Sequence, residues 1–127
     1  MKIKLTILLI VVVAAVILTA AYFTVWRTPA ATDTSDAAVT IVRTKGGYEP
    51  EVVTIKVGQT VAWVNEHDEY HWPASDLHPT HGIYPEFDPR SPVAPGETWQ
   101  FTFAEVGEWA YHDHLRANVV GKIIVTE

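Results

Sequence analysis

Cysteine is absent from this chain of 127 residues, and an excess of basic residues is absent as well. The lack of cysteine excludes disulfide bonds, zinc-finger sites and thiol catalysis. From residue 38 onward six Lys and Arg stand against thirteen Asp and Glu, which is a net charge of −7. An acidic domain repels phosphate backbones, so we expect no nucleic-acid partner, and metal cations or a basic protein fit the charge better.

Familiar enzyme motifs are missing too. The sequence has no phosphate-cradling glycine loop and no internal repeat. Ser75 and Ser91 belong to no readable triad, and Glu86 and Asp88 lie in a segment where carboxylates usually cap turns. Without a separate acid–base set, the sequence does not predict an enzyme.

Charge is also absent from residues 5–26, a mostly apolar run of 22 residues between Lys4 and Arg27. About 20 such residues cross a bilayer core, whereas the apolar stretch of a cleaved signal peptide has about 7–15 and is followed by a small-x-small site. No clear site of that kind follows here, so we favour an uncleaved transmembrane anchor over a signal peptide. Lys2 and Lys4 then keep residues 1–4 in the cytoplasm and place the domain on the extracytoplasmic side of the cell membrane, periplasmic or extracellular.

The remaining chain predicts a tether and one all-β domain. Residues 27–37 are small, polar and proline-containing, as in a flexible linker, and residues 38–127 form the folded part. Short segments with alternating apolar residues, separated by turn signals, indicate an antiparallel β-sandwich. We expect strands at 39–43, 51–57, 60–65, 98–103, 107–112 and 120–126. Much of the core area is expected from Trp63, Trp99, Phe101, Phe103, Trp109 and Tyr111.

The segment at residues 66–96 is too long for an ordinary connection, and such loops are usually functional or disordered. Its prolines and aromatic residues argue for a stiff, packed loop. It holds four of the six histidines, and the other two lie in an H-x-H at the end of a predicted strand. Neutral imidazole is the commonest protein ligand for copper, zinc and nickel. We therefore predict a metal site from His71, His78, His81, His112 and His114.

His67 is left out of this prediction, because Glu66, Asp68 and Glu69 surround it with a solvated acidic turn. An all-imidazole site favours Cu(II), which tops the affinity order of the divalent metals, and Zn(II) is the alternative for the same ligands. Chance clustering of the histidines is the competing interpretation. On that interpretation the domain is a metal-free interaction module.

Three stretches of the domain resemble the cupredoxin family, in the framework typical of plastocyanin and amicyanin. Residues 52–64 (VVTIKVGQTVAWV), followed by Asn65 and His71, are similar to the strands that lead to the first copper histidine of that family. Residues 94–97 (APGE) with 99–103 resemble its P-G-x strand. Residues 107–125 are similar to its closing motif Y-x-C-x-x-H-x-x-M-x-G-x-x-x-V. The resemblance implies a Greek-key β-sandwich that binds copper.

The resemblance ends at the blue-copper ligands themselves. Asp113 stands in the place of the cysteine, Arg116 in that of the second histidine and Val119 in that of the methionine. Because a blue site depends on the copper–thiolate bond, intense blue colour and a type 1 electron-transfer site are not implied.

The segment from Trp109 to His114 is similar to the W-Y-H-x-H motif of multicopper oxidase domains, in which the H-x-H pair faces another copper. That likeness implies a site at His112 and His114 beneath the loop that carries His78 and His81. His71 either joins this site or lies near Asp113 in the degenerate blue pocket. The combined expectation is a membrane-tethered, extracytoplasmic copper-binding protein. The alternatives are an electron-transfer protein or small copper oxidoreductase, and a zinc-binding or metal-free interaction module.

Overall fold

The computed structural model describes residues 36–127. The predicted anchor at 5–26, the stub at 1–4 and nearly all of the linker lie outside the described residues. Within residues 36–127, no helix is long and apolar enough to cross a membrane.

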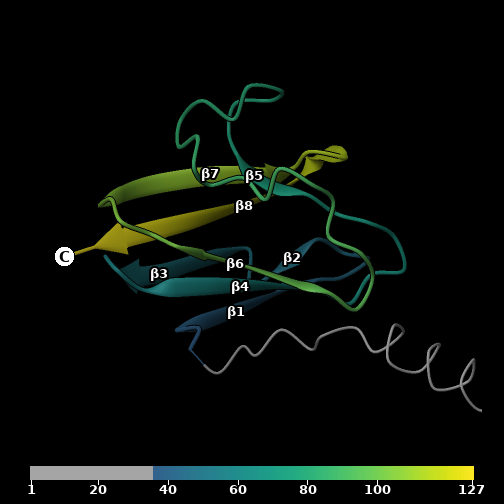
Figure 1. The fold of residues 1–127 in the computed structure, drawn as a ribbon, viewed down its shortest axis with the longest axis horizontal. Helices are drawn as coiled ribbons and strands as arrows, with labels where there is room; N and C mark the ends of the chain where they lie inside the picture. The colour runs from purple at the N-terminus through teal and green to yellow at the C-terminus, as the bar shows by residue number, and fades with distance from the viewer. Residues whose placement is uncertain (1–35) are drawn as a thin grey trace, which may run out of the picture. The chain divides into compact units, whose positions relative to one another are not determined.

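The described residues form eight strands in two four-stranded sheets, which lie as two layers in Figure 1. The order of the first sheet is β2-β1-β4-β6, with β2 at Tyr48–Glu49, β1 at Val39–Arg43, β4 at Thr60–Asn65 and β6 at Thr98–Thr102. The order of the second is β3-β8-β7-β5, with β3 at Val52–Lys56, β8 at Arg116–Thr126, β7 at Gly107–Asp113 and β5 at Pro73–Ser75. The all-β prediction is therefore confirmed.

The predicted antiparallel arrangement is wrong in part, because both sheets are mixed. β1 runs parallel to β4, and β3 runs parallel to β8, while the other neighbouring pairs are antiparallel. The chain leaves the first sheet after β2, adds β3 to the second, and returns to place β4 beside β1. Alternation along a strand shows which face is buried, but it carries no information about the direction of the neighbouring strand.

The predicted strands at 39–43 and 60–65 have the same bounds in the structure, and β8 begins four residues before the predicted start at 120. Two short strands, β2 and β5, were not predicted. They have two and three residues, which is too few for a period of two to be visible. β5 begins with Pro73 and lies at a sheet edge, where a residue without an N–H is tolerated.

The core between the sheets is aromatic, and part of it comes from the long loop. Trp63, Phe103 and Tyr111 are fully buried as predicted, whereas Trp99, Phe101 and Trp109 are only partly buried. Phe87, in the second half of the loop segment, is fully buried with its ring 5.1 Å from that of Trp63. The loop is therefore packed into the core. Figure 1 shows its other part rising beyond β5 and β7, above that layer.

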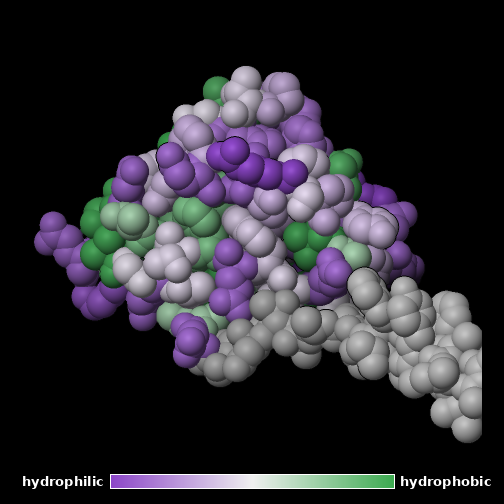
Figure 2. All heavy atoms as spheres, viewed as in Figure 1, coloured by the Kyte–Doolittle hydropathy of each residue, from purple (hydrophilic) through white to green (hydrophobic). Residues whose placement is uncertain are grey.

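The surface carries apolar residues mostly as small patches. On the face in Figure 2, hydrophilic side chains lie between the apolar ones. Scattered apolar residues of this kind are normal on a folded domain. The large apolar residues that are exposed are Val52, Val57, Tyr70, Leu77, Ile83, Val106, Leu115 and Val120.

Gly121 gives a direct test of the packing between β7 and β8. It lies opposite Tyr111 in the register, and a Cβ added there would lie 2.4 Å from the Tyr111 ring. We predict that Gly121→Ala lowers the free energy of unfolding by about 1–3 kcal/mol, because the buried ring has nowhere to move. Urea titration followed by tryptophan fluorescence measures the change. Gly46→Ala is the matched control, since the nearest atoms to its added Cβ are 3.5 Å away, and equal stability of the two variants would contradict the prediction.

Candidate metal centre

The structure brings four of the five predicted histidines together. His78 and His81 come from the loop after β5, His112 from β7, and His114 from the turn between β7 and β8. His78 Nδ1 lies 3.2 Å from His112 Nε2, and His81 Nε2 lies 2.9 Å from His114 Nδ1. We call these four residues the histidine cluster.

The nitrogens of the cluster are close enough to share an ion. One ring nitrogen from each of His78, His112 and His114 lies within 4.8 Å of the other two. His81 extends this set of three through its contact with His114. The structure thus brings together side chains from segments more than thirty residues apart.

Two carboxylates lie behind the cluster. Asp76 Oδ1 is 2.7 Å from His112 Nδ1, and Asp88 Oδ2 is 2.7 Å from His81 Nδ1. A carboxylate on one ring nitrogen holds the proton there, orients the ring and leaves the other nitrogen as an electron-pair donor. In both histidines that other nitrogen is Nε2, the atom that faces a second histidine of the cluster. Carboxylate–imidazole pairs of this kind are the usual outer support of a metal ligand.

The sequence contained only part of the signal for these carboxylates. Asp88 also accepts a hydrogen bond from the N–H of Arg90, the turn-capping role expected of it. Its contact with His81 depends on how the loop folds back, which spacing alone does not show. Asp76 extends the β5–β7 pairing, because its N–H donates to the carbonyl of Ala110. That pairing places Asp76 diagonally across from His112, within side-chain reach.

Trp72 packs against the cluster. Its ring lies 4.8 Å from that of His114, and its Nε1–H donates to Asp88 Oδ1 at 2.7 Å. The same carboxylate therefore holds both Trp72 and His81. Partial burial lowers the pKa of His114, and its neighbours His81, His78 and His112 lower it further. His114 is thus neutral at physiological pH, the form that binds metals.

The cluster is closed on one side and open on the other. His112 and His81 are 2% and 6% exposed, whereas His78 is exposed. Ser75 supports the closed side, because its Oγ lies 2.8 Å from the carbonyl oxygens of both His81 and Tyr84. An ion therefore has a route to the buried donors from the side of His78.

His71 and His67 lie elsewhere. His71 is fully buried, and its Nδ1 lies 3.3 Å from the hydroxyl of Tyr48. This is the second of the two positions considered for it, beside Asp113. His67, which was left out of the prediction, accepts a hydrogen bond from the N–H of Glu69 at its Nδ1.

The surroundings of His71 do not fit a type 1 copper. We call Arg43, Tyr48, His71 and Asp113 the polar pocket. The buried Arg43 places its Nε 3.5 Å from Asp113 Oδ2, so a guanidinium already balances the carboxylate that stands in the cysteine position. The Tyr48 hydroxyl occupies the Nδ1 side of His71. With no thiolate and a fixed positive charge inside, the pocket lacks the ligand set of a type 1 copper site.

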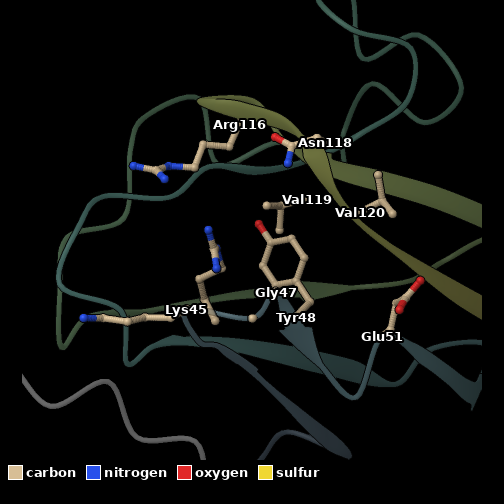
Figure 3. Close-up of a pocket in the computed structure, with 10 residues that line it drawn as sticks. Lys45, Gly47, Tyr48, Glu51, Arg116, Asn118, Val119 and Val120 are labelled. Carbon is tan, nitrogen blue, oxygen red and sulfur yellow. The ribbon is translucent and has the colours of Figure 1, made fainter.

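Arg116 and Val119, at the other two ligand positions of the blue-copper motif, also have side chains that are unsuited to binding copper. Arg116 pairs with Glu69 at the surface, and Val119 is an apolar side chain packed against the core. Figure 3 shows Tyr48 beneath Val119 and Asn118, with Lys45 and Arg116 to one side and Glu51 to the other. These residues line a hollow of about 410 Å³, and Arg43 and Tyr48 of the polar pocket form part of its wall.

A model of the cupredoxin-like domain matches residues 10–125. This chain belongs to the cupredoxin-like family. Amicyanin from Paracoccus denitrificans is 30% identical over 97 residues, covering 76% of this cupredoxin and 71% of amicyanin.

Two solved structures illustrate the range of the likeness. A purple cupredoxin from Nitrosopumilus maritimus superposes with a TM-score of 0.61 at 25% identity, covering 69% of this chain and 99% of that one. A Cu-containing nitrite reductase from Thermus scotoductus gives a TM-score of 0.60 at 28% identity, covering 70% of this chain but 22% of the reductase. The resemblance drawn from the sequence is confirmed, and this cupredoxin lacks the type 1 cysteine.

The buried His71 makes stability depend on pH. Burial lowers its pKa to about 4, and the nearby charges of Arg43 and His67 act in the same direction. Between pH 6.5 and 4 the unfolded chain takes up a proton that the folded one does not, so folding loses up to about 1.4 kcal/mol per pH unit there as pH falls. We predict that His71→Asn flattens this dependence in urea titrations of the metal-free protein. Parallel curves for the two proteins between pH 4 and 6.5 would contradict it.

Proposed function

We propose that this cupredoxin binds Cu(II) at the histidine cluster and serves in copper handling on the outer side of a membrane. The observation that carries the proposal is the cluster itself: four imidazoles from two distant segments, two of them oriented by carboxylates. Binding would use the ring nitrogens of His78, His81, His112 and His114. His71, which the sequence included among the ligands, is left out because it lies in the polar pocket against Tyr48.

The donor set favours copper on chemical grounds. Cu(II) binds nitrogen donors more tightly than any other divalent metal of the first row. The acidic domain attracts cations, and the copper-containing relatives make copper the expected metal of this fold. Bound copper supplies a one-electron redox centre.

Carriage of the metal is favoured over catalysis by the number of donors. Four protein ligands fill a four-coordinate site, as in structural sites, whereas catalytic sites keep a position open. The exposed His78 gives the ion a way in and out. Electron transfer is the second candidate, because the amicyanin framework is shared. It ranks second because the blue-copper ligands are missing.

Copper binding is tested on the full chain in detergent, with Cu(II) titration and EPR spectroscopy. We expect one tightly bound Cu(II) with nitrogen hyperfine structure and without the intense blue thiolate band. Replacing His112 and His114 with alanine should weaken binding by a hundredfold or more, roughly, since loss of a mere outer partner costs about 10–100-fold. His67→Ala is the matched control and should bind as the unaltered protein does.

Each other outcome points to a different function. Unchanged affinity in the His112 and His114 variants would overturn the site. Preference for Zn(II) in direct competition would make this a zinc protein. A reversible Cu(II)/Cu(I) wave in voltammetry would favour electron transfer. Absence of both metals at micromolar concentration would favour an interaction module.

The membrane tether is the second part of the proposal, and it is supported by the uncharged run at residues 5–26. We predict that the full chain stays in the membrane fraction after alkaline carbonate extraction. Replacing Val13 and Ile17 with arginine should release it, because each arginine near the middle of a span costs about 2.5–3.5 kcal/mol. Replacing Thr34 and Ser35 with arginine, outside the run, is the control. Release of the unaltered chain would contradict a tether.

A further inference from the structure

Asp113 makes more contacts than its place in the cysteine position requires. Its Oδ1 accepts hydrogen bonds from the N–H of Trp72 at 2.9 Å and from the N–H of Leu115 at 3.1 Å. The N–H of His114 in turn donates to the carbonyl of Trp72 at 2.8 Å. One carboxylate oxygen thus ties the turn that carries His114 to the segment that leads into β5.

The second oxygen of Asp113 faces Arg43. Arg43 is 3% exposed, and its guanidinium reaches Asp113 from β1 in the opposite sheet while also donating to the carbonyl of Thr44. It lies over the ring of Tyr48 at 5.8 Å. Arg43 is therefore the link through which the first sheet holds the end of β7.

Asp113 lies between two histidines of the cluster in the chain, so whatever fixes Asp113 also affects them. His112 and His114 flank it. The register between β7 and β8 shifts at this point, since His112 pairs with Val120 and Asp113 with Arg116, and the unpaired residues lie on β8. Successive side chains at a strand end point to opposite sides. With Asp113 drawn inward to Arg43, its two neighbours are directed to the other side, where their rings lie 6.3 Å apart.

We propose that Arg43 and Asp113 are positioning residues that hold His112 and His114 in their ligating arrangement before any metal binds. This inference rests on the proposed copper-binding function. Neither residue belongs to the histidine cluster; Arg43 supplies a permanent cation beside Asp113, which stands in the cysteine position of the blue-copper motif. The pair is therefore a built-in substitute that keeps the strand end in place without metal.

A role in the stability of the fold alone accounts less well for the Arg43–Asp113 pair than a role in positioning the histidines. A buried ion pair is often no more stabilising than apolar residues of the same volume, because desolvation offsets the attraction. The pair fixes geometry instead, since Asp113 bonds to two backbone N–H groups and Arg43 determines where its second oxygen points. The readout must therefore report on ligand geometry, beyond stability.

The test uses Asp113→Asn, which keeps an acceptor for the two N–H groups but removes the charge, and Arg43→Met, which removes the cation. We expect each to weaken Cu(II) binding on the order of tenfold, the lower end of the effect of losing an outer partner. The nitrogen hyperfine pattern in EPR should change as well. Arg43→Lys should restore most of the affinity. Glu108→Gln is the matched control. Glu108 lies on β7, as Asp113 does, and the change removes only its surface ion pair with Lys122.

The unaltered, metal-free protein gives a readout that needs no variant. The N–H groups of Trp72 and Leu115 should exchange slowly with solvent, and NMR should show one fixed tautomer for the His112 ring. The Arg43→Met, Asp113→Asn double variant avoids a buried unpaired charge, and it should fold yet show averaged signals for the rings of His112 and His114. This variant keeps the test open if either single variant unfolds.

The outcomes separate the two proposals. If the unaltered protein binds no copper, the proposed function fails, while the ring signals of the metal-free protein still decide whether the pair positions the histidines. If the protein binds copper but the folded variants have unchanged affinity, spectra and ring signals, the positioning role is overturned. Rapid exchange of the Trp72 and Leu115 N–H groups in the unaltered protein would overturn it as well.

Discussion

The carboxylate of Asp113 sits where the two sheets, the long loop and the histidine cluster meet. Its hydrogen bonds hold the segment at Trp72 and the turn at Leu115, and its free oxygen faces a buried guanidinium from the opposite sheet. A charge can remain inside a protein when a partner and hydrogen bonds satisfy it. Here the guanidinium is the partner of one oxygen and two backbone N–H groups bond to the other, so the strand end beside the two histidines is tied to both sheets.

The polar pocket and the histidine cluster lie on opposite sides of β7 and differ in their charges. On the inner side, the polar pocket is filled by its own cation, and its histidine is neutral because burial lowers the pKa to about 4. On the outer side, the cluster has donors without a cation, and two carboxylates orient the rings from behind. Asp113 and its neighbour His112 therefore belong to different centres, although they are adjacent along the strand.

Much of this arrangement was readable from the chain, and the failures have physical causes. The strands at 39–43 and 60–65 were predicted with their bounds, because one face of each is buried over at least five residues. Alternation in Trp109, Tyr111 and Asp113 placed His112 and His114 together on the opposite face. The same alternation in Val39, Ile41 and Arg43 puts a charge on the core side of β1, a signal that had no interpretation until Asp113 was seen opposite it.

Local pattern therefore accounts for the sandwich class, the histidines that meet and the loss of the blue-copper ligands. These properties depend on which residue occupies each position and on periods of two along a strand, both of which are present in the linear chain. Parallel pairing of β1 with β4, the carboxylates behind His81 and His112, and the place of His71 in the polar pocket required the folded molecule. Each of these joins residues that only long-range contacts bring together, and such contacts leave no periodic trace in the segments that make them.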